Sequence, residues 1–100
     1  MDIQKPFESN FTIYTKSGCS NCLKLKKMLK EKNLFFNTID CDEYLIENKS
    51  DFLLFFKKNY DKDIKEFPIV FNDGKFLGGY EETIDYINKL YLIFEEFISF

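Results

Sequence analysis

The chain has 100 residues, 45% of them apolar and 19% aromatic, which is enough to bury the core of one globular domain and argues against intrinsic disorder. A net charge of −3 and a pI near 5.0 argue against nucleic acid as the main partner. No apolar run approaches the roughly 20 residues of a membrane span, and residues 1–6 lack the charged-then-apolar order of a secretion signal. We therefore expect a single cytoplasmic domain over residues 1–100, with no nucleic-acid or membrane partner.

The first half of the chain predicts a strand, a helix and a second strand. Residues 1–9 form a short lead-in, and the β-branched and aromatic residues at 10–15 predict the first strand. A lysine-rich helix is expected from Ser20 to Lys32, and a second strand over 35–40. The three elements predict a right-handed βαβ unit with two parallel strands. Three apolar residues of the helix are expected to face the core, with Leu25 at its margin: Leu23, Met28 and Leu29.

Residues 41–60 predict a further helix, interrupted early. A break is expected at Asn48-Lys49-Ser50, with the main segment starting near Ser50. Cys41 precedes this helix and follows the second strand, so it lies on the sheet edge where the first strand also ends. We interpret it as a semi-buried structural cysteine, with a regulatory thiol or an intermolecular disulfide as the alternatives.

The remaining residues predict a hairpin and a last helix. The Asp73-Gly74 pair supplies the positive φ angles of a tight turn between strands at 68–71 and 76–78. A helix is expected from about Glu81 toward the C-terminus. The order is β-α-β-α-β-β-α, which predicts an α/β fold with a small mixed four-stranded sheet and helices on both faces.

Cys19 and Cys22 lie where the first strand leads into the first helix, and helical geometry brings their sulfurs within disulfide reach. The helix N-terminus favours a thiolate at Cys19, so we assign it as the nucleophile and Cys22, one turn inside, as the resolving thiol. The chain has no histidine, which excludes Cys–His catalysis. Three cysteines cannot complete a four-thiolate zinc site in one chain.

Three separated motifs carry a resemblance to a known family. They are Lys16-Ser17-Gly18-Cys19-Ser20-Asn21-Cys22, Phe67-Pro68 and Gly78-Gly79-Tyr80-Glu81-Glu82. Their order and approximate spacing are similar to those of the glutaredoxin family, in its dithiol C-x-x-C type, with C-S-N-C as the active-site sequence. The resemblance covers roughly residues 9–90 and implies a thioredoxin-like fold.

The resemblance also implies how the nucleophile is surrounded. In the family, the proline that matches Pro68 is cis and lies beside the nucleophile. The backbone of the preceding residue, here Phe67, is offered to an incoming cysteinyl peptide like a partner strand. A lysine at the position of Lys16 favours the Cys19 thiolate and meets the glycyl carboxylate of glutathione.

The third motif is implied to hold the other end of glutathione. A helix N-terminus binds anions through its free N–H groups, so the backbone of Tyr80 and Glu81 would bind the γ-glutamyl carboxylate. Gly78 and Gly79 would leave room for the tripeptide. Glu81 or Glu82 would meet its ammonium group.

The implied function is a glutathione-dependent thiol-disulfide oxidoreductase that reduces protein disulfides and protein–glutathione mixed disulfides, with glutathione as the reducing co-substrate. One alternative is a [2Fe–2S] cluster held between two subunits by Cys19 of each and two glutathiones, which Ser20 permits. Another is a dedicated electron donor, for example to ribonucleotide reductase. Glu66 favours that alternative mildly, whereas the Gly78–Glu81 motif argues against it.

Two departures from the family pattern concern the site itself. The family's common C-P-Y-C is here C-S-N-C, which loosens the helix start and removes an aromatic wall beside glutathione. The usual threonine-valine before the cis proline is Glu66-Phe67, and Glu66 places a negative charge near the thiolate. We expect these departures to change efficiency and substrate preference rather than class.

Residues 91–100 are predicted to extend the last helix as an apolar C-terminal extension. Two apolar stripes about 100° apart run along this helix, whereas a single-sided surface helix needs only one. The extra width either folds over the chain's own core or packs on a second chain, so we expect a monomer or a weak homodimer. The stripes are Ile84, Ile87, Tyr91, Phe94 and Ile98, and Tyr86, Leu90, Ile93, Phe97 and Phe100.

Overall fold

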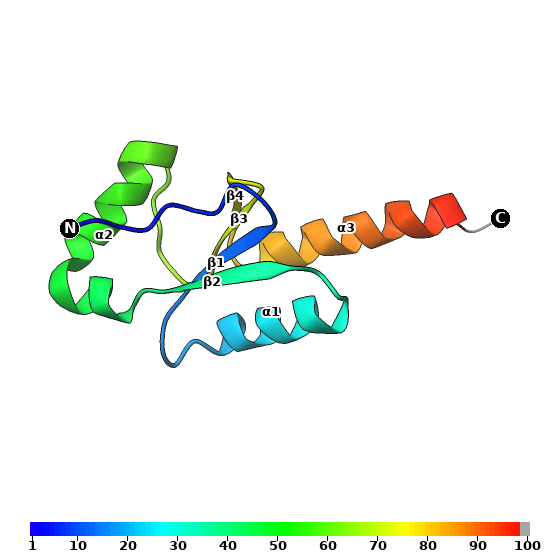
Figure 1. Ribbon diagram of the computed structural model, residues 1–100, viewed down its shortest axis with the longest axis horizontal. Coiled ribbons are helices and arrows are strands. Elements are labelled where there is room, and N and C mark those ends of the chain that lie inside the picture. Colours follow the sequence, from blue (N-terminus) through cyan, green and yellow to red (C-terminus); the bar gives the residue numbers. More distant parts are fainter. Residues whose placement is uncertain (99–100) are drawn as a thin grey trace.

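The computed structural model describes the backbone of residues 1–98 and the side chains of residues 1–92. Its elements follow the predicted order (Figure 1). They are β1 (Phe11–Thr15), α1 (Ser20–Glu31), β2 (Phe36–Asp40), α2 (Asp42–Tyr60), β3 (Ile69–Asn72), β4 (Lys75–Gly78) and α3 (Tyr80–Ile98). No helix among these described elements is long and apolar enough to cross a membrane.

The sheet has the strand order β2-β1-β3-β4, so β1 is central. It runs parallel to β2 and antiparallel to β3, and Tyr14 is paired with both Ile39 and Ile69. All five residues of β1 are buried, which fits a strand covered on both faces. The predicted mixed four-stranded sheet is therefore confirmed. The ends of β1 and β2 and the start of β3 meet at one edge.

Successive residues of β1 point to opposite faces of the sheet and contribute to two cores. On one face, Tyr14 packs with Phe52 and Phe56 of α2. On the other face, Ile13 packs with residues of α1 and α3, and Figure 1 shows α1 and α2 on opposite sides of the sheet. The α2 side is rich in aromatic rings, with ring centroids of Tyr14 and Phe56 5.1 Å apart. Aromatic pairs in this geometry add stability beyond the area they bury.

The core-facing side of α1 differs from the prediction. Cys22, Leu25 and Leu29 are buried, whereas Leu23 is 65% exposed. The spacing of three and four residues from Cys22 defines the buried face, and Leu23 lies about 100° away from it. The prediction treated Cys22 only as a reactive group. It therefore missed that this cysteine occupies the first core position of the helix.

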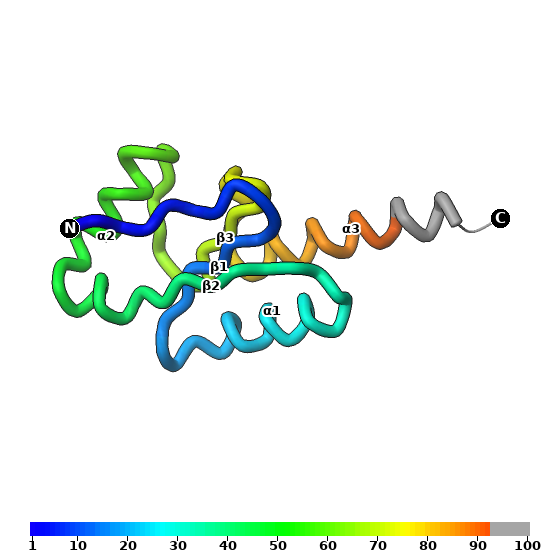
Figure 2. Tube along the Cα trace, in the orientation of Figure 1, coloured from blue at the N-terminus to red at the C-terminus, as the bar shows by residue number. Residues whose placement is uncertain are grey.

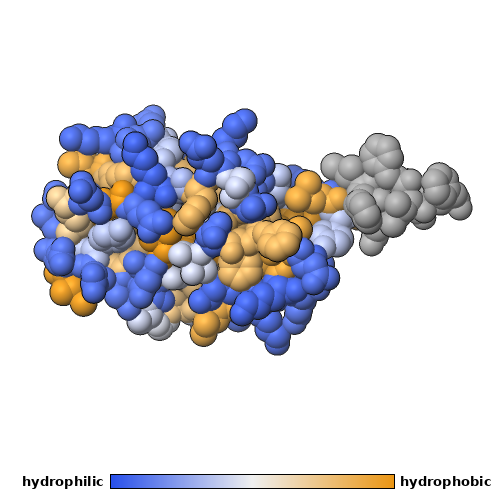
Figure 3. Space-filling view, in the orientation of Figure 1, coloured by the Kyte–Doolittle hydropathy of each residue, from blue (hydrophilic) through white to orange (hydrophobic). Residues whose placement is uncertain are grey.

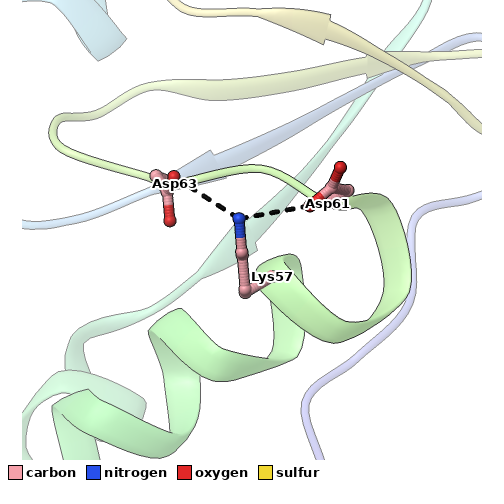
Figure 4. A network of polar contacts seen from close by, with 3 residues as sticks. All are labelled: Lys57, Asp61 and Asp63. Carbon is pink, nitrogen blue, oxygen red and sulfur yellow. Dashed lines mark ion pairs between the residues drawn. The ribbon is translucent and has the colours of Figure 1, made fainter.

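The break in α2 is confirmed, at Asn48, whose φ of −161° and ψ of 88° are not helical. Its side-chain oxygen accepts a hydrogen bond from the Asp51 N–H at 3.1 Å, so Asn48 is the N-cap of the main segment. The main segment therefore begins at Lys49, in agreement with the predicted start near Ser50. At the other end, Lys57 forms ion pairs with Asp61 at 3.1 Å and Asp63 at 3.6 Å (Figure 4).

The hairpin turn is as predicted, because Asp73 and Gly74 both have positive φ angles, of 52° and 77°. The last helix begins at Tyr80, one residue before its predicted start. On its described part, the hydroxyl of Tyr91 donates to the Lys32 carbonyl at 2.9 Å, which ties α3 to the end of α1. Five members of the predicted apolar stripes lie outside the residues whose side chains are described: Ile93, Phe94, Phe97, Ile98 and Phe100.

The N-terminal lead-in is held against the domain. Figure 2 shows it running past α2 toward the sheet. The buried hydroxyl of Tyr14 donates to the Gln4 carbonyl at 2.6 Å, and the Gln4 N–H donates to the hydroxyl of Tyr44 at 3.1 Å. Sequence periodicity carries no signal for these contacts.

Candidate active site

The two cysteines of the C-S-N-C sequence form a disulfide, with their Cα atoms 5.3 Å apart. Cys19 is the N-cap residue of α1, and its sulfur accepts a hydrogen bond from the Cys22 N–H at 3.1 Å. In the reduced protein, the same N–H and the helix dipole would stabilise a thiolate at Cys19. Cys19 is 9% exposed and Cys22 2%, so Cys19 is the sulfur that solvent reaches more easily.

The loop before Cys19 is held by a residue that the sequence analysis did not single out. Both the N–H and the hydroxyl of Ser17 donate to the carboxylate of Asp42, the first residue of α2, and the N–H bond is 2.8 Å long. The hydrogen bonds from Ser17 lower the pKa of Asp42, and the Lys16 cation acts in the same direction. Asp42 therefore stays ionised and joins α2 to the active-site loop. The sequence signal for Asp42 is its position two residues after the end of β2, the strand that pairs with β1.

Phe67 and Pro68 lie at the same sheet edge. The peptide bond between them is cis. The next residue, Ile69, is paired with Tyr14 near the end of β1, so Pro68 is next to the strand end that leads to Cys19. The ammonium group of Lys16 lies 5.6 Å from the centre of the Phe67 ring. Lys16 and Phe67 are thus brought together from loops far apart in the sequence.

Next to Gly78 and Gly79, the side chain of Glu82 caps the N-terminus of α3. The Gly79 N–H donates to the Glu82 carboxylate at 2.9 Å, and the Thr83 hydroxyl donates to the Gly79 carbonyl at 2.7 Å. This is one half of a capping box. A Cβ atom at Gly78, whose φ is +140°, would lie 2.8 Å from Glu82 Cβ. The space over Gly78 is therefore filled by Glu82 of the same chain.

Three cavities surround this region. The largest, about 360 Å³, is lined by both cysteines of the disulfide and by Lys16. A second, about 240 Å³, is lined by Lys16 and Phe67. A third, about 270 Å³, is lined by Pro68, Gly78 and Gly79. The predicted site residues are thus spread over three hollows, of which Lys16 borders two, and Tyr80 and Glu81 line none of these three.

Cys41, the third cysteine, is shielded from solvent, unlike Cys19. Cys41 is fully buried, and its thiol points toward the Ile39 carbonyl at 3.5 Å. Burial raises the pKa of this thiol to about 12, with a smaller contribution from the Asp40 carboxylate. A protonated, inaccessible thiol is a poor nucleophile, so Cys41 agrees with the structural interpretation.

The fold and the site together define a class of protein. A four-stranded mixed sheet of thioredoxin-like topology carries a cysteine pair at the start of its first helix, and a cis proline lies at the sheet edge that leads to this helix. This arrangement is that of the thiol-disulfide oxidoreductases of the thioredoxin-like fold.

Comparison with known proteins narrows the class to one family. The family model described as Glutaredoxin matches residues 11–77. Glutaredoxin 1 of Rickettsia felis is 34% identical over 73 residues, and that of Rickettsia conorii 33%; each match covers 73% of this chain and 67% of the relative. The chain belongs to the glutaredoxin family.

Solved structures agree with this assignment. The crystal structure of glutaredoxin 1 from Francisella tularensis complexed with cacodylate has a TM-score of 0.65 at 27% identity, covering 80% of this chain and 93% of that one. The buckwheat glutaredoxin–glutathione complex also has a TM-score of 0.65, at 21% identity, covering 84% of this chain and 73% of that one. The second likeness supports the fold alone.

Proposed function

We propose that this protein reduces protein disulfides and protein–glutathione mixed disulfides at the expense of glutathione. The observation that carries the proposal is the placement of Cys19 as N-cap of α1, with the Cys22 N–H 3.1 Å from its sulfur. This placement stabilises a thiolate at neutral pH and makes Cys19 a good leaving group in the following step. Membership of the family and the glutathione bound in the buckwheat relative support glutathione as the reductant.

The chemistry is two successive exchanges. The Cys19 thiolate attacks the glutathione sulfur of a mixed disulfide; a new Cys19–glutathione bond forms, the old disulfide breaks, and the released protein thiolate takes up a proton. A second glutathione thiolate then attacks this intermediate, which yields glutathione disulfide and restores Cys19. For a protein disulfide, Cys19 attacks one of the two sulfurs and the other leaves as a thiolate, which gives a Cys19–protein disulfide. Cys22 then attacks Cys19, which forms the Cys19–Cys22 bond, breaks the bond to the protein and releases its second thiolate. Two glutathiones reduce the Cys19–Cys22 bond and leave as glutathione disulfide.

We further propose that glutathione lies along the sheet edge between the loop of Lys16 and the start of α3. Lys16 would hold the glycyl carboxylate, the backbone of Phe67 the cysteinyl part, and the N–H groups of Tyr80 and Glu81 the γ-glutamyl carboxylate. The cation at Lys16 beside the Phe67 ring and the free N–H groups of a helix start support this placement. The Glu82 carboxylate, which already occupies the Gly79 N–H, reduces the number of donors left for the ligand.

The test is turnover of a small glutathione mixed disulfide in the presence of glutathione, glutathione reductase and NADPH. Cys19→Ser is expected to abolish turnover, because Cys22, the other thiol of the site, is only 2% exposed and lies inside the helix, where it does not meet the substrate first. Cys22→Ser is expected to keep deglutathionylation and to lose reduction of protein disulfides. Cys41→Ser is the matched control and should keep both activities. If Cys22→Ser abolishes both, the assigned roles are wrong.

If the folded wild-type protein does not turn over the mixed disulfide, the proposed glutathione-dependent reduction is wrong. The two alternatives are then tested directly, by absorption spectra after anaerobic cluster reconstitution and by reduction with thioredoxin reductase. Sedimentation velocity over a dilution series tests the homodimer through α3 separately. A monomer at all concentrations would contradict the expected homodimer.

A further inference from the structure

We propose that one face of α1 binds an acidic surface of the folded protein that the disulfide site reduces. This inference rests on the proposed function and names the kind of protein substrate that the site prefers. The face begins directly after Cys22 and runs along the side of α1 that borders β2. Its residues have the spacing of one helical face, and we call it the lysine face: Leu23, Lys26, Lys27 and Lys30.

The lysine face is open to solvent, although α1 packs on the sheet through its other side. Leu23 is 65% exposed, Lys27 and Lys30 are exposed, and Lys26 is half-buried. Hydrophilic residues cover most of the lower margin of the surface in Figure 3, where α1 lies in Figure 1. The face therefore offers a partner several cations around one large apolar side chain.

The charge of α1 is opposite to that of the chain as a whole. The helix carries four lysines and one glutamate, whereas the chain has a net charge of −3. That glutamate, Glu31, is the last residue of the helix and lies outside the lysine face. Both ion pairs among the described side chains belong to Lys57, so no described carboxylate pairs with a lysine of this face. Complementary charge on a partner would set partner choice and association rate more than total affinity.

The lysine face begins beside the reacting disulfide. Leu23 and Lys26 line the cavity of about 360 Å³ whose wall also contains Cys19 and Cys22. The Leu23 N–H donates to the Cys19 carbonyl at 3.3 Å. From there the face extends over about two helical turns, roughly 10 Å along the axis of α1. A protein whose sulfur reaches Cys19 from this side would place its neighbouring surface on the lysine face.

The shape of the face fits a protein surface rather than a small anion. A small anion needs several donors that converge on one point, whereas these lysines lie along the outside of a helix. Of the three cavities described above, only the one beside the disulfide reaches the face, and the Asp40 carboxylate in its wall repels an anion there. Spaced cations around an exposed leucine suit a partner with several carboxylates and an apolar residue. No residue of the face is among those that we assign to glutathione.

The experiment uses a small designed three-helix bundle as the substrate, with a single glutathionylated cysteine on its surface. Three exposed positions around this cysteine are all glutamate in one bundle and all glutamine in the other. Wild-type protein is expected to give a kcat/KM roughly fivefold higher for the glutamate bundle at low salt, and the ratio should fall toward one at high salt. Lys27→Gln/Lys30→Gln should lose most of this preference. Lys27→Glu/Lys30→Glu should instead prefer a bundle with three lysines at these positions.

Two controls make the same change in charge outside the lysine face. Lys58→Gln/Lys75→Gln removes two exposed lysines from α2 and β4 and should keep the preference. On α1 itself, Lys24→Gln should leave the ratio unchanged, whereas Lys27→Gln should lower it. Turnover of a small glutathione mixed disulfide should be the same in all these variants, because that substrate has no acidic surface.

Three results would overturn the proposal: equal kcat/KM for the glutamate and glutamine bundles in the wild type, an unchanged preference in Lys27→Gln/Lys30→Gln, or the same loss in Lys58→Gln/Lys75→Gln. The last result would assign the preference to net charge alone.

Binding of a glutamate bundle with serine in place of cysteine, followed by fluorescence anisotropy, gives a readout independent of catalysis. If the wild-type protein turns over no substrate, the proposed function fails, and loss of this binding in Lys27→Gln/Lys30→Gln still supports the lysine face. Absence of binding, or binding of a labelled oligonucleotide in its place, would overturn the proposal.

Discussion

Single residues of the same type have opposite chemistry in this protein because their surroundings differ. Cys19 caps a helix, accepts an N–H bond and lines a cavity, all of which favour an ionised, reactive sulfur. Cys41 is enclosed near two carboxylates, those of Asp40 and Asp42, which favours the protonated thiol. Reactivity therefore follows from burial and nearby charge, and the two thiols can be tested separately.

For Cys41, we predict a loss of stability at high pH. Its folded pKa of about 12 lies above that of an unfolded cysteine, so between about pH 9 and 10 the unfolded chain releases a proton that the folded protein keeps. The free energy of unfolding should then fall by up to about 1.4 kcal/mol per pH unit. Urea unfolding of the oxidised protein measures this slope. Cys41→Ala should flatten it, and an unchanged slope would contradict the assignment. Tyr14 and Tyr60, whose pKa values are also raised by burial, contribute increasingly as the pH approaches that of an unfolded tyrosine, about 10, so the difference between wild type and Cys41→Ala is the quantity to compare.

For Asp42, we predict that Asp42→Ala lowers kcat/KM for the mixed disulfide by roughly tenfold, because the loop before Cys19 loses its anchor. The pKa of Asp42 is lowered on folding, so its stabilisation is present above pH 4 or so and is lost as the pH falls through the folded value. Unfolding at pH 7 and at pH 3 should show a larger variant effect at the higher pH. Ser17→Ala, which keeps the N–H donor, should have a smaller effect on kcat/KM; an equal effect would assign the anchoring to the hydroxyl.

At the scale of elements, the site depends on how helices begin. Both α1 and α3 start beside the disulfide edge, and α2 begins twice, at Cys41 and again at Asn48. Each start brings free N–H groups to this side of the sheet. The exposed ion pairs of Lys57 at the other end of α2 contribute little by comparison, because water screens them.

For the junction of β4 and α3, we predict that Gly78→Ala destabilises the protein by about 2 kcal/mol or more. The added Cβ would meet Glu82 at 2.8 Å, in addition to the cost of a φ of +140°. Gly18→Ala is the comparison, since that glycine has a φ of +76° with nothing within 4 Å of its Cβ, and it should cost about 1–2 kcal/mol. Urea denaturation measures both. The double variant Gly78→Ala/Glu82→Gly, compared with Glu82→Gly alone, should recover the part due to the clash, and no recovery would assign the whole loss to the backbone.

At the scale of the whole molecule, two cores and a pinned N-terminal segment hold the sheet in place. The sheet is buried on both faces, by α2 on one side and by α1 and α3 on the other. The lead-in adds Ile3 to the edge of the aromatic core, and the backbone of Gln4 donates a hydrogen bond to Tyr44 and accepts one from Tyr14. Residues outside the sheet and helices thus contribute to the stability of the described domain.

We predict that Tyr14→Phe lowers the free energy of unfolding by about 1 kcal/mol, the usual net value of one such hydrogen bond. The same change should speed amide hydrogen exchange at residues 3–7 while leaving exchange in β1 nearly unchanged. Tyr44→Phe, which removes the acceptor of the Gln4 N–H at a more exposed place, should have a smaller effect. Unchanged exchange at residues 3–7 in Tyr14→Phe would show that packing alone holds the lead-in.

The sequence by itself determined the features that depend on near neighbours in the chain. The turn at Asp73-Gly74, the break near Asn48 and the order of elements follow from local backbone preferences and from apolar periodicity. The pairing of Cys19 with Cys22 follows from their spacing at a helix start. These properties involve residues only a few positions apart, so tertiary contacts do not change them.

Only the tertiary structure decided the features that depend on which distant segments meet. Whether Leu23 or Leu25 faced the core depended on how α1 is rotated on the sheet, and the sequence pattern predicted it wrongly. The contacts of Asp42 with Ser17 and of Lys16 with Phe67 arise because strand ends and loops far apart in sequence share one edge. The parallel pairing of β1 with β2 and the hairpin of β3 and β4 bring these segments together. Periodicity reports which face of an element is apolar, whereas the register between elements fixes what each side chain touches.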